Sequence, residues 1–168
     1  GVQTCALPIS NISKTKNIAI LGTKSVIKSK NLSNYITKCR LQKRIIIHKI
    51  NASPLVELVE SGKFLTDKKY CKNIILKTLK DDFSKNKIDT ATLSSTHLPF
   101  LNKLLNLEFS NITFIDPADI IAKQVAKVIN TKHSKQNSLK IFTSGNPKIF
   151  QKNLSKLGIK NKVKFMKT

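Results

Sequence analysis

The residues best suited to chemistry stand together near the middle of the chain. The apolar segment "IDTATL" at 88–93 is followed directly by Ser94, Ser95, Thr96 and His97. Hydroxyls, an imidazole and free backbone N–H groups at the start of a helix can hold an anion such as a carboxylate. A plain helix cap is the alternative, because one Ser or Thr satisfies the first N–H groups of a helix. One cap explains only one of the four residues, so the stretch predicts a binding site.

The cysteines and the other histidines show no spacing that indicates a site. Cys5, Cys39 and Cys71 are far apart in the sequence and form no C-x-x-C pair. Neither His48 nor His133 lies at metal-ligand spacing from a cysteine. We therefore predict no metal site, free thiols in a reducing cytosol, and structural or solvated roles for both histidines.

Apolar runs and helical periodicity alternate along the chain. Short apolar or β-branched runs predict strands at 17–22, 43–50, 88–93, 111–116, 139–144 and 162–166. Periodic segments predict helices at 24–39, 54–62, 67–85, 98–107, 118–130 and 147–158, with a polar loop at 131–138. The apolar positions expected to face the core are Val26, Ile27, Tyr35 and Ile36 in the first helix and Tyr70, Ile74, Ile75 and Leu79 in the third. Strands that alternate with helices predict an α/β fold with a largely parallel sheet.

The predicted fold places the polar stretch where such folds bind ligands. In α/β sheets the ligand lies at the carboxyl ends of the strands, and residues 94–97 follow a strand directly. Thr23 and Ser25 follow another strand end and could also contact a substrate. Simple turn residues and helix caps are the more frequent interpretation of these two.

Length, charge and aromatic content argue against a membrane-spanning protein and against a nucleic-acid-binding protein. The chain has 168 residues, long enough for one domain with a real core, and no apolar run reaches the roughly 18 residues that span a bilayer. The net charge of +22 is spread along every segment, and only 6% of the residues are aromatic. Nucleic-acid modules concentrate cations on one face and interleave aromatic residues. We therefore predict no specific nucleic-acid partner and no membrane span.

The first ten residues, "GVQTCALPIS", differ in composition from the rest of the chain. They contain no lysine, whereas the following segment is rich in it. The segment at 1–10 is interpreted as a non-native leader that resembles a translated sequencing adapter. A native leader peptide is the alternative.

Five segments carry motifs in a characteristic order. They are "NIAILGTKSVIKS" at 17–29, "NASPLVELVESG" at 51–62, "IDTATLSSTHLPFL" at 88–101, "ITFIDPADIIAKQV" at 112–125 and "IFTSGNPKIFQKNLSKLG" at 141–158. The set resembles glutamate racemase and the wider aspartate/glutamate racemase family. In that family a strand ends in L-G-C-T-H-Y-P, and an A-C-P-x-x-V-P-x-V-E-x-G element, one residue longer than here, precedes it. The chain is thus identified as a carboxy-terminal fragment of such an enzyme.

The resemblance implies a cofactor-independent amino-acid racemase that acts on glutamate or aspartate. Two cysteines face the α-carbon of the substrate in this family; one removes the α-proton and the other returns a proton to the opposite face. On this chain Ser95 stands at the position of the second cysteine, as a catalytic residue. Thr96 and His97 stand at the residues that bind the substrate and tune the thiol, and Glu60 stands at the family's acidic residue near that histidine.

The chain departs from the racemase motifs at two points, so a non-catalytic protein of the same fold remains an alternative. Ser95 has a hydroxyl, a much weaker acid than a thiol, and His97 is the only obvious base near it. The D-S-G opening and the first C-N-T motif of the family are absent from the 168 residues. The leading interpretation is a truncated racemase, inactive as given; the alternative is a non-catalytic relative that binds amino acids or carboxylates.

The resemblance also implies an architecture. Residues 11–115 are expected to form the second, three-layer α/β domain of the racemase type, and residues 116–168 the returning part of the first, incomplete domain. The expected partner is a small amino-acid substrate, the expected location is the cytoplasm, and a homodimer is one option for the full-length protein.

Overall fold

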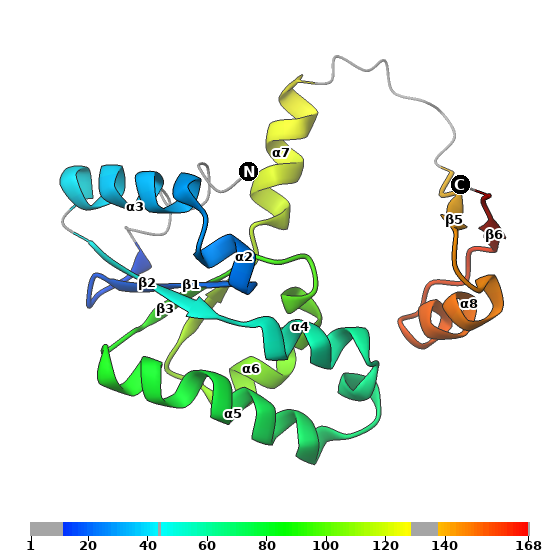
Figure 1. Ribbon diagram of the computed structural model, residues 1–168, viewed down its shortest axis with the longest axis horizontal. Coiled ribbons are helices and arrows are strands. Elements are labelled where there is room, and N and C mark those ends of the chain that lie inside the picture. Colours follow the sequence, from blue (N-terminus) through cyan, green and yellow to red (C-terminus); the bar gives the residue numbers. More distant parts are fainter. Residues whose placement is uncertain (1–11, 44, 129–137, 168) are drawn as a thin grey trace. The chain divides into compact units, whose positions relative to one another are not determined.

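The structure is a computed structural model that describes residues 12–43, 45–128 and 138–167, and the chain divides into two compact units, residues 1–128 and residues 129–168. The first unit contains β1 (Asn17–Gly22), α2 (Lys24–Ile27), α3 (Lys30–Lys43), β2 (Ile46–Asn51), α4 (Ser53–Glu60), the 3-10 helix η2 (Lys63–Leu65), α5 (Lys68–Lys85), β3 (Thr90–Leu93), the 3-10 helix η3 (Leu98–Leu101), α6 (Asn102–Glu108), β4 (Thr113–Ile115) and α7 (Ala118–Val128). The second unit contains β5 (Ile141–Thr143), α8 (Pro147–Lys156) and β6 (Val163–Phe165) (Figure 1).

The first unit is built on a parallel sheet with the strand order β2-β1-β3-β4. Ile18 of β1 pairs with Ile47 of β2 on one side and with Thr90 of β3 on the other. Because β1 and β3 have neighbours on both sides and helices over both faces, their residues are nearly all buried. The predicted parallel α/β fold is confirmed, and the strand predicted at 17–22 has the bounds expected.

Helices cover both faces of this sheet, which makes the first unit three layers deep. Helices α4, α5 and α6 lie on one side, and α3 and α7 lie on the other (Figure 1). The larger apolar cluster lies under α4, α5 and α6 and includes Leu55, Ile75, Leu79, Leu101 and Leu105. A smaller cluster packs α3 against β1 and β2 through Ile18, Ile20, Leu32, Ile36, Ile45 and Ile47.

The single helix predicted at 24–39 is wrong, because the chain forms two helices there. Helix α2 ends at Ile27, and α3 begins at Lys30. The hydroxyl of Ser29 accepts a hydrogen bond from the N–H of Leu32 at 3.2 Å and so caps the start of α3. An internal serine at this position therefore marks the start of a new helix.

The buried face of α5 differs by one residue from the predicted face. Ile75 and Leu79 are fully buried as expected, but Tyr70 is 40% exposed and the core position belongs to Cys71. Residues four apart share one face of a helix, and Cys71 lies four residues before Ile75. The Tyr70 ring instead lies at the surface under the ammonium group of Lys63, 4.2 Å from its centroid.

Asp89 connects the segment that precedes β1 to the start of β3 through hydrogen bonds. Its carboxylate accepts hydrogen bonds from the Ser13 hydroxyl at 2.6 Å, the N–H groups of Lys14 and Thr15 at 2.7 and 2.8 Å, and the Thr90 hydroxyl at 3.0 Å. Burial by itself raises the pKa of Asp89, but these hydrogen bonds together outweigh it and hold the pKa below its usual value. The charged carboxylate is thus part of the fold at the amino-terminal edge of the sheet.

The second unit is small. Strands β5 and β6 pair in parallel, and α8 connects them after a cap in which Asn146 accepts from the N–H groups of Lys148 and Ile149. Val163 is the one large apolar side chain that is buried among the residues described in this unit. The unit boundary after Val128 does not test the predicted division at 115, which stays a prediction. Among the described residues, no helix is long and apolar enough to cross a membrane.

Candidate functional site

The carboxyl ends of β1, β2 and β3 lie side by side at one edge of the sheet. The N–H of Ser94 donates to the carbonyl of Leu21 at 3.0 Å, and the N–H of Ala52 donates to the carbonyl of Gly22 at 2.8 Å. The loops that follow the three strands therefore start at the same edge. This is the edge at which α/β folds bind ligands, and residues 94–97 lie there.

A second polar group lies at the same edge. The hydroxyl of Ser53 donates to the side-chain oxygen of Asn51 at 2.8 Å and accepts from the N–H of Lys24 at 3.1 Å. The hydroxyls of Thr23 and Ser25 lie 3.0 Å apart. Sequence reasoning named Thr23 and Ser25 but missed Asn51 and Ser53. A signal was available, because Asn51 also ends a strand of the sheet.

Ser95, His97 and Glu60 form a row of side chains, called the Ser95–His97–Glu60 row below. The Ser95 hydroxyl lies 3.5 Å from His97 Nδ1, and His97 Nε2 lies 3.4 Å from Glu60 Oε1. With the proton on Nε2, the ring donates to the Glu60 carboxylate and Nδ1 can accept from the Ser95 hydroxyl. The arrangement can therefore move a proton between the Ser95 hydroxyl and the imidazole.

Two packed helix ends position the backbone of Glu60 and His97, whose side chains are 60% and 38% exposed. Glu60 is the last residue of α4, which is anchored by the buried side chains of Leu55 and Leu58. His97 immediately precedes η3, whose first residue Leu98 is fully buried. Gly62 ends the α4 turn with a φ of 71°, a left-handed conformation that favours glycine. The predicted proline start and glycine end of this segment thus position Glu60.

The plain cap does not account for the polar stretch. The side chain of His97, the residue before η3, makes no capping hydrogen bond. The Ser95 hydroxyl accepts from the N–H of His97 at 3.4 Å, a long contact. Ser94 shares a 2.8 Å hydrogen bond with Thr92, and Thr96 is exposed. The structure therefore brings Ser95, His97 and Glu60 together and leaves the Thr96 hydroxyl beside them at the surface.

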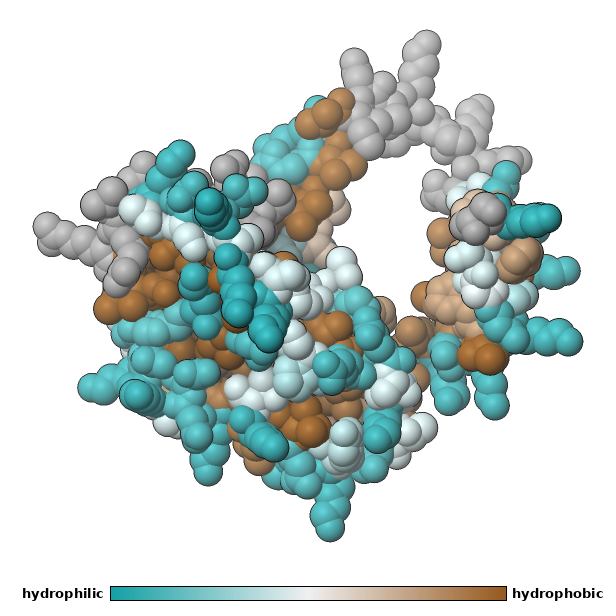
Figure 2. All heavy atoms as spheres, viewed as in Figure 1, coloured by the Kyte–Doolittle hydropathy of each residue, from teal (hydrophilic) through white to brown (hydrophobic). Residues whose placement is uncertain are grey.

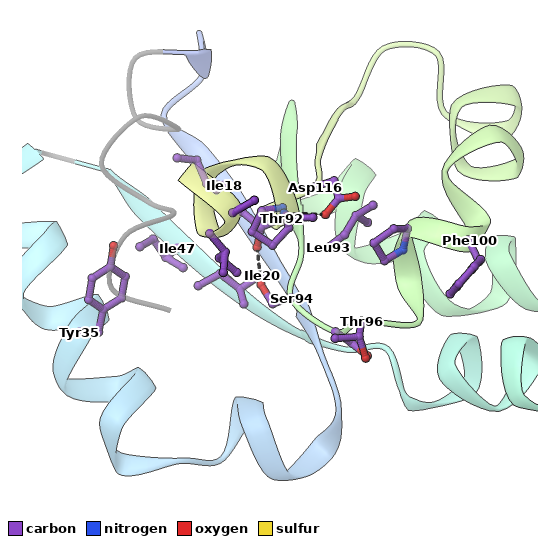
Figure 3. Close-up of a pocket in the computed structure, with 16 residues that line it drawn as sticks. Ile18, Ile20, Tyr35, Ile47, Thr92, Leu93, Ser94, Thr96, Phe100 and Asp116 are labelled. Atoms are coloured by element: carbon purple, nitrogen blue, oxygen red, sulfur yellow. Dashed lines mark hydrogen bonds between the residues drawn. The ribbon is translucent and has the colours of Figure 1, made fainter. Parts of the chain in front are cut away.

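A hollow of about 720 Å³ adjoins Ser95 on the side of the sheet covered by α3 and α7 (Figure 3). Its apolar lining comes from the sheet, from α3 and from the start of α7, and includes Ile18, Ile20, Tyr35, Ile47, Ile121 and Ala122. Its polar side chains include Thr92, Ser94, Ser95, Thr96 and Asp116. Ser95 and Thr96 line the hollow, whereas His97 and Glu60 do not. Sequence reasoning missed this hollow, because it depends on the placement of α7.

The remaining candidates lie apart from this edge. Cys71 is buried, and burial, followed by the charge of Asp67, raises the pKa of its thiol. The ring of His48 bonds with the side chain of Asn17 at 3.1 Å, in the sheet. Residues 1–10 with Cys5, and residues 131–137 with His133, lie outside the described residues, and the side chain of Cys39 is also not described. No group of three or more His, Cys, Asp and Glu that could hold a metal occurs among the described residues.

The chain has an α/β fold of the type found in solved glutamate racemases. The chain superposes on a glutamate racemase isoform from Bacillus anthracis with a TM-score of 0.77 and 21% identity, over 99% of this chain and 62% of that one. It also superposes on the Escherichia coli glutamate racemase, solved with L-glutamate and an activator, with a TM-score of 0.71 and 18% identity over 95% and 61% of the two chains.

The curated relatives that match the sequence are named glutamate racemase. The chain is 31% identical over 149 residues to the glutamate racemase of a Sulfurihydrogenibium species, covering 89% of this chain and 52% of the relative. Glutamate racemases are thus its homologues, and the resemblance found in the sequence is confirmed. The chain spans about half the length of the curated relatives it matches. No protein-family model matches the chain.

Proposed function

We propose that this chain supplies one side of the active site of an amino-acid racemase that acts on glutamate, with aspartate as a second substrate. The Ser95–His97–Glu60 row is the observation that carries the proposal. The Ser95 hydroxyl, which can carry a proton, lies at the ligand-binding edge of a racemase fold. The His97 imidazole next to it can act as a base, and the Glu60 carboxylate contacts the other side of that imidazole. The homologues are glutamate racemases, and one of the similar structures was solved with L-glutamate.

Each residue has a separate role in this proposal. Ser95 exchanges a proton with the α-carbon of the amino acid, and His97 takes up or supplies the proton of the Ser95 hydroxyl. Glu60 orients the imidazole through its contact with Nε2. Thr96 and His97 bind the substrate, and the second acid/base group acts from the opposite face of the α-carbon. The reaction needs no cofactor, and a homodimer remains a prediction for the full-length protein.

Ser95 also supports a second candidate function, that of a non-catalytic amino-acid-binding relative. A hydroxyl is a far weaker acid than a thiol, whose pKa is about 8.5. A protein that kept the fold and the polar edge but had lost the thiol could still bind a carboxylate through the hydroxyls and backbone N–H groups of residues 94–97.

The substrate class is tested by titrating the ¹⁵N-labelled chain with L-glutamate, L-aspartate or L-lysine. Half of a site binds weakly, with a Kd expected in the millimolar range, about −4 kcal/mol or less favourable. The two acidic amino acids should shift the amide signals of Ser95, Thr96 and His97, and Thr96→Val should weaken the response. Lysine should not shift them. Equal shifts with all three amino acids, or none at the end of β3, would contradict the proposal.

The two candidate functions are separated in a chimera in which this chain replaces the matching part of the Sulfurihydrogenibium enzyme. Under the racemase proposal the chimera racemises glutamate, Ser95→Cys raises the rate, and His97→Ala lowers it about a hundredfold, as a loss of roughly 3 kcal/mol of transition-state stabilisation would. A chimera that binds glutamate but becomes active only with Ser95→Cys would indicate the binding relative. Glu57→Gln, an exposed change on the same helix as Glu60, is the matched control.

A further inference from the structure

The Ser95–His97–Glu60 row contains the three groups that activate a serine for attack on a carbonyl carbon. Such a nucleophile needs a base within reach of its hydroxyl and a third group that orients the base. Here Nδ1 lies 3.5 Å from the Ser95 hydroxyl, and the opposite ring nitrogen lies 3.4 Å from the Glu60 carboxylate. Contacts of this kind are often long before a substrate binds. A thiol at this position would serve proton exchange, whereas a hydroxyl with this support can also serve acyl transfer.

The hollow beside Ser95 indicates which acyl group would be accepted. Isoleucines of the sheet and the first turn of α7 line it, and Asp116 is the one charged residue among the described residues of the lining. Among the described residues, no lysine or arginine lines it, although the chain as a whole carries 31 of these residues. A volume of about 720 Å³ suits a small organic ligand, and the lining favours an uncharged, apolar group.

A donor for the developing oxyanion lies next to the nucleophile. The N–H of the residue after a nucleophilic serine commonly fills this role. Here that residue is Thr96, whose N–H makes no hydrogen bond within the part of the chain that the structure describes. By contrast, the N–H of His97 contacts the Ser95 hydroxyl and the N–H of Leu98 bonds to the Ser95 carbonyl. The Thr96 N–H therefore remains available at the site.

We infer that Ser95, with His97 as base and Glu60 as the orienting carboxylate, is a nucleophile toward esters of apolar acids, an activity separate from racemisation. Ser95 Oγ forms a bond to the acyl carbon as its proton moves to Nδ1, and the carbonyl electron pair moves onto the oxygen beside the Thr96 N–H. When the carbonyl re-forms, the bond to the alcohol oxygen breaks and that oxygen takes the proton from Nδ1. Water then repeats both steps, releases the acid and restores the Ser95 hydroxyl.

The activity is tested on the purified chain with p-nitrophenyl butyrate and with a fluorophosphonate that labels activated serines. The probe should label Ser95, located by peptide mass spectrometry, and the ester should be hydrolysed above the rate in buffer. Ser95→Ala should reduce hydrolysis to the buffer rate, and His97→Gln should lower it about a hundredfold, the size of a general-base contribution. Glu60→Gln should lower it less, about tenfold. Glu57→Gln, one turn earlier on α4 and exposed, should leave the rate unchanged.

The hollow is tested with a matched pair on α7. Ile121 lines the hollow, whereas Val125, one turn later and similarly exposed, does not. The chain should prefer the butyrate over the acetate ester; Ile121→Glu should abolish that preference and Val125→Glu should keep it. An Ile121→Glu variant that keeps the preference would remove the hollow from the proposal.

Labelling of the unaltered chain does not depend on any variant folding, so it decides the main point. If Ser95 stays unlabelled while the chain shows native circular dichroism, the inference is wrong. Hydrolysis that persists in a folded Ser95→Ala variant would overturn it equally. Neither result would bear on glutamate binding or racemisation, which rest on separate measurements.

Discussion

Ser95 depends on its neighbour for any role in proton transfer. Its hydroxyl does not ionise near neutral pH, so the imidazole of His97 must accept or supply the proton. That imidazole is held on its other side by Glu60, at 3.4 Å. The chemistry at this position is therefore a property of three side chains rather than of one.

The reactivity of a thiol placed at residue 95 should show whether the side chain at this position contacts the His97 imidazole. In Ser95→Cys the sulfur would lie beside His97 Nδ1, and a cationic imidazole lowers the pKa of a thiol below its usual value of about 8.5. We expect iodoacetamide to alkylate this thiol faster than the thiol of Ser84→Cys, an exposed position on α5. Peptide mass spectrometry separates these thiols from the native cysteines. Adding His97→Ala should remove the difference.

Equal alkylation rates at positions 95 and 84 would show that the imidazole does not tune residue 95. The buried Cys71 serves as an internal reference, because burial raises the pKa of its thiol and blocks access. Fast reaction of Cys71 would instead indicate that the variant had unfolded.

At the scale of elements, the sequence predicts a strand or helix correctly where a single apolar run, or the apolar face of one helix, determines the structure. The run at 17–22 is buried on both sides, so its apolar character alone identifies β1. The break at Ser29 and the exposure of Tyr70 were missed, because a cap and a one-residue rotation of a helix depend on tertiary contacts. For the site, sequence placed residues 94–97 at the correct edge. It could not supply their distances to Glu60, which depend on the packing of α4.

Asp89 gives a stability prediction for the edge opposite the site. The ionised carboxylate accepts four hydrogen bonds, and its pKa is lowered overall. Asp89→Asn should reduce the free energy of unfolding at pH 7 by about 1.5–3 kcal/mol, the range for hydrogen bonds to a charged group. Urea titration measures this change. Asp81→Asn, an exposed carboxylate on α5, is the control and should change stability little.

The same carboxylate sets a pH dependence. Because the folded pKa of Asp89 lies below the unfolded value of about 3.9, its contribution is fully present above that value. It is lost as the pH falls through the lower folded pKa. The stability difference between the native chain and Asp89→Asn should therefore shrink below about pH 4. A difference that stayed constant down to pH 2 would show that the charge is not involved.

At the scale of the whole molecule, the two units differ in how much apolar surface they bury. The first unit has two apolar clusters, whereas Val163 is the one large apolar side chain buried among the described residues of the second. Large apolar side chains stay exposed on α7 and on the second unit (Figure 2): Ile121, Val125, Val128, Leu139, Phe142, Ile149, Phe150, Phe165 and Met166. A two-stranded sheet with so little burial is marginal in water.

The two units should therefore behave differently when they are separated. Residues 11–128 should unfold cooperatively, with a Tm within about 3 °C of that of the whole chain, which corresponds to roughly 1 kcal/mol. A peptide of residues 129–168 should give the circular dichroism of an unfolded chain and poorly dispersed amide signals. A cooperative melt of the isolated peptide would show that its small core is sufficient.

The last prediction concerns the chain of 168 residues as a catalyst. Racemisation requires acid/base groups on both faces of the α-carbon, and the Ser95–His97–Glu60 row approaches from the ends of α4 and β3 only. Among the described residues, Cys71 is buried on the inner face of α5 and the His48 ring bonds with Asn17, so neither offers the second group. We expect the purified chain to bind L-glutamate without exchanging its α-proton for solvent deuterium, as measured by ¹H NMR in D₂O beside an active glutamate racemase. Deuterium uptake that disappears in Ser95→Ala would show that this single row can remove and return a proton. Uptake with the L configuration retained would mean that the row acts on one face only, whereas formation of D-glutamate would show that racemisation needs no second acid/base group beyond those described here.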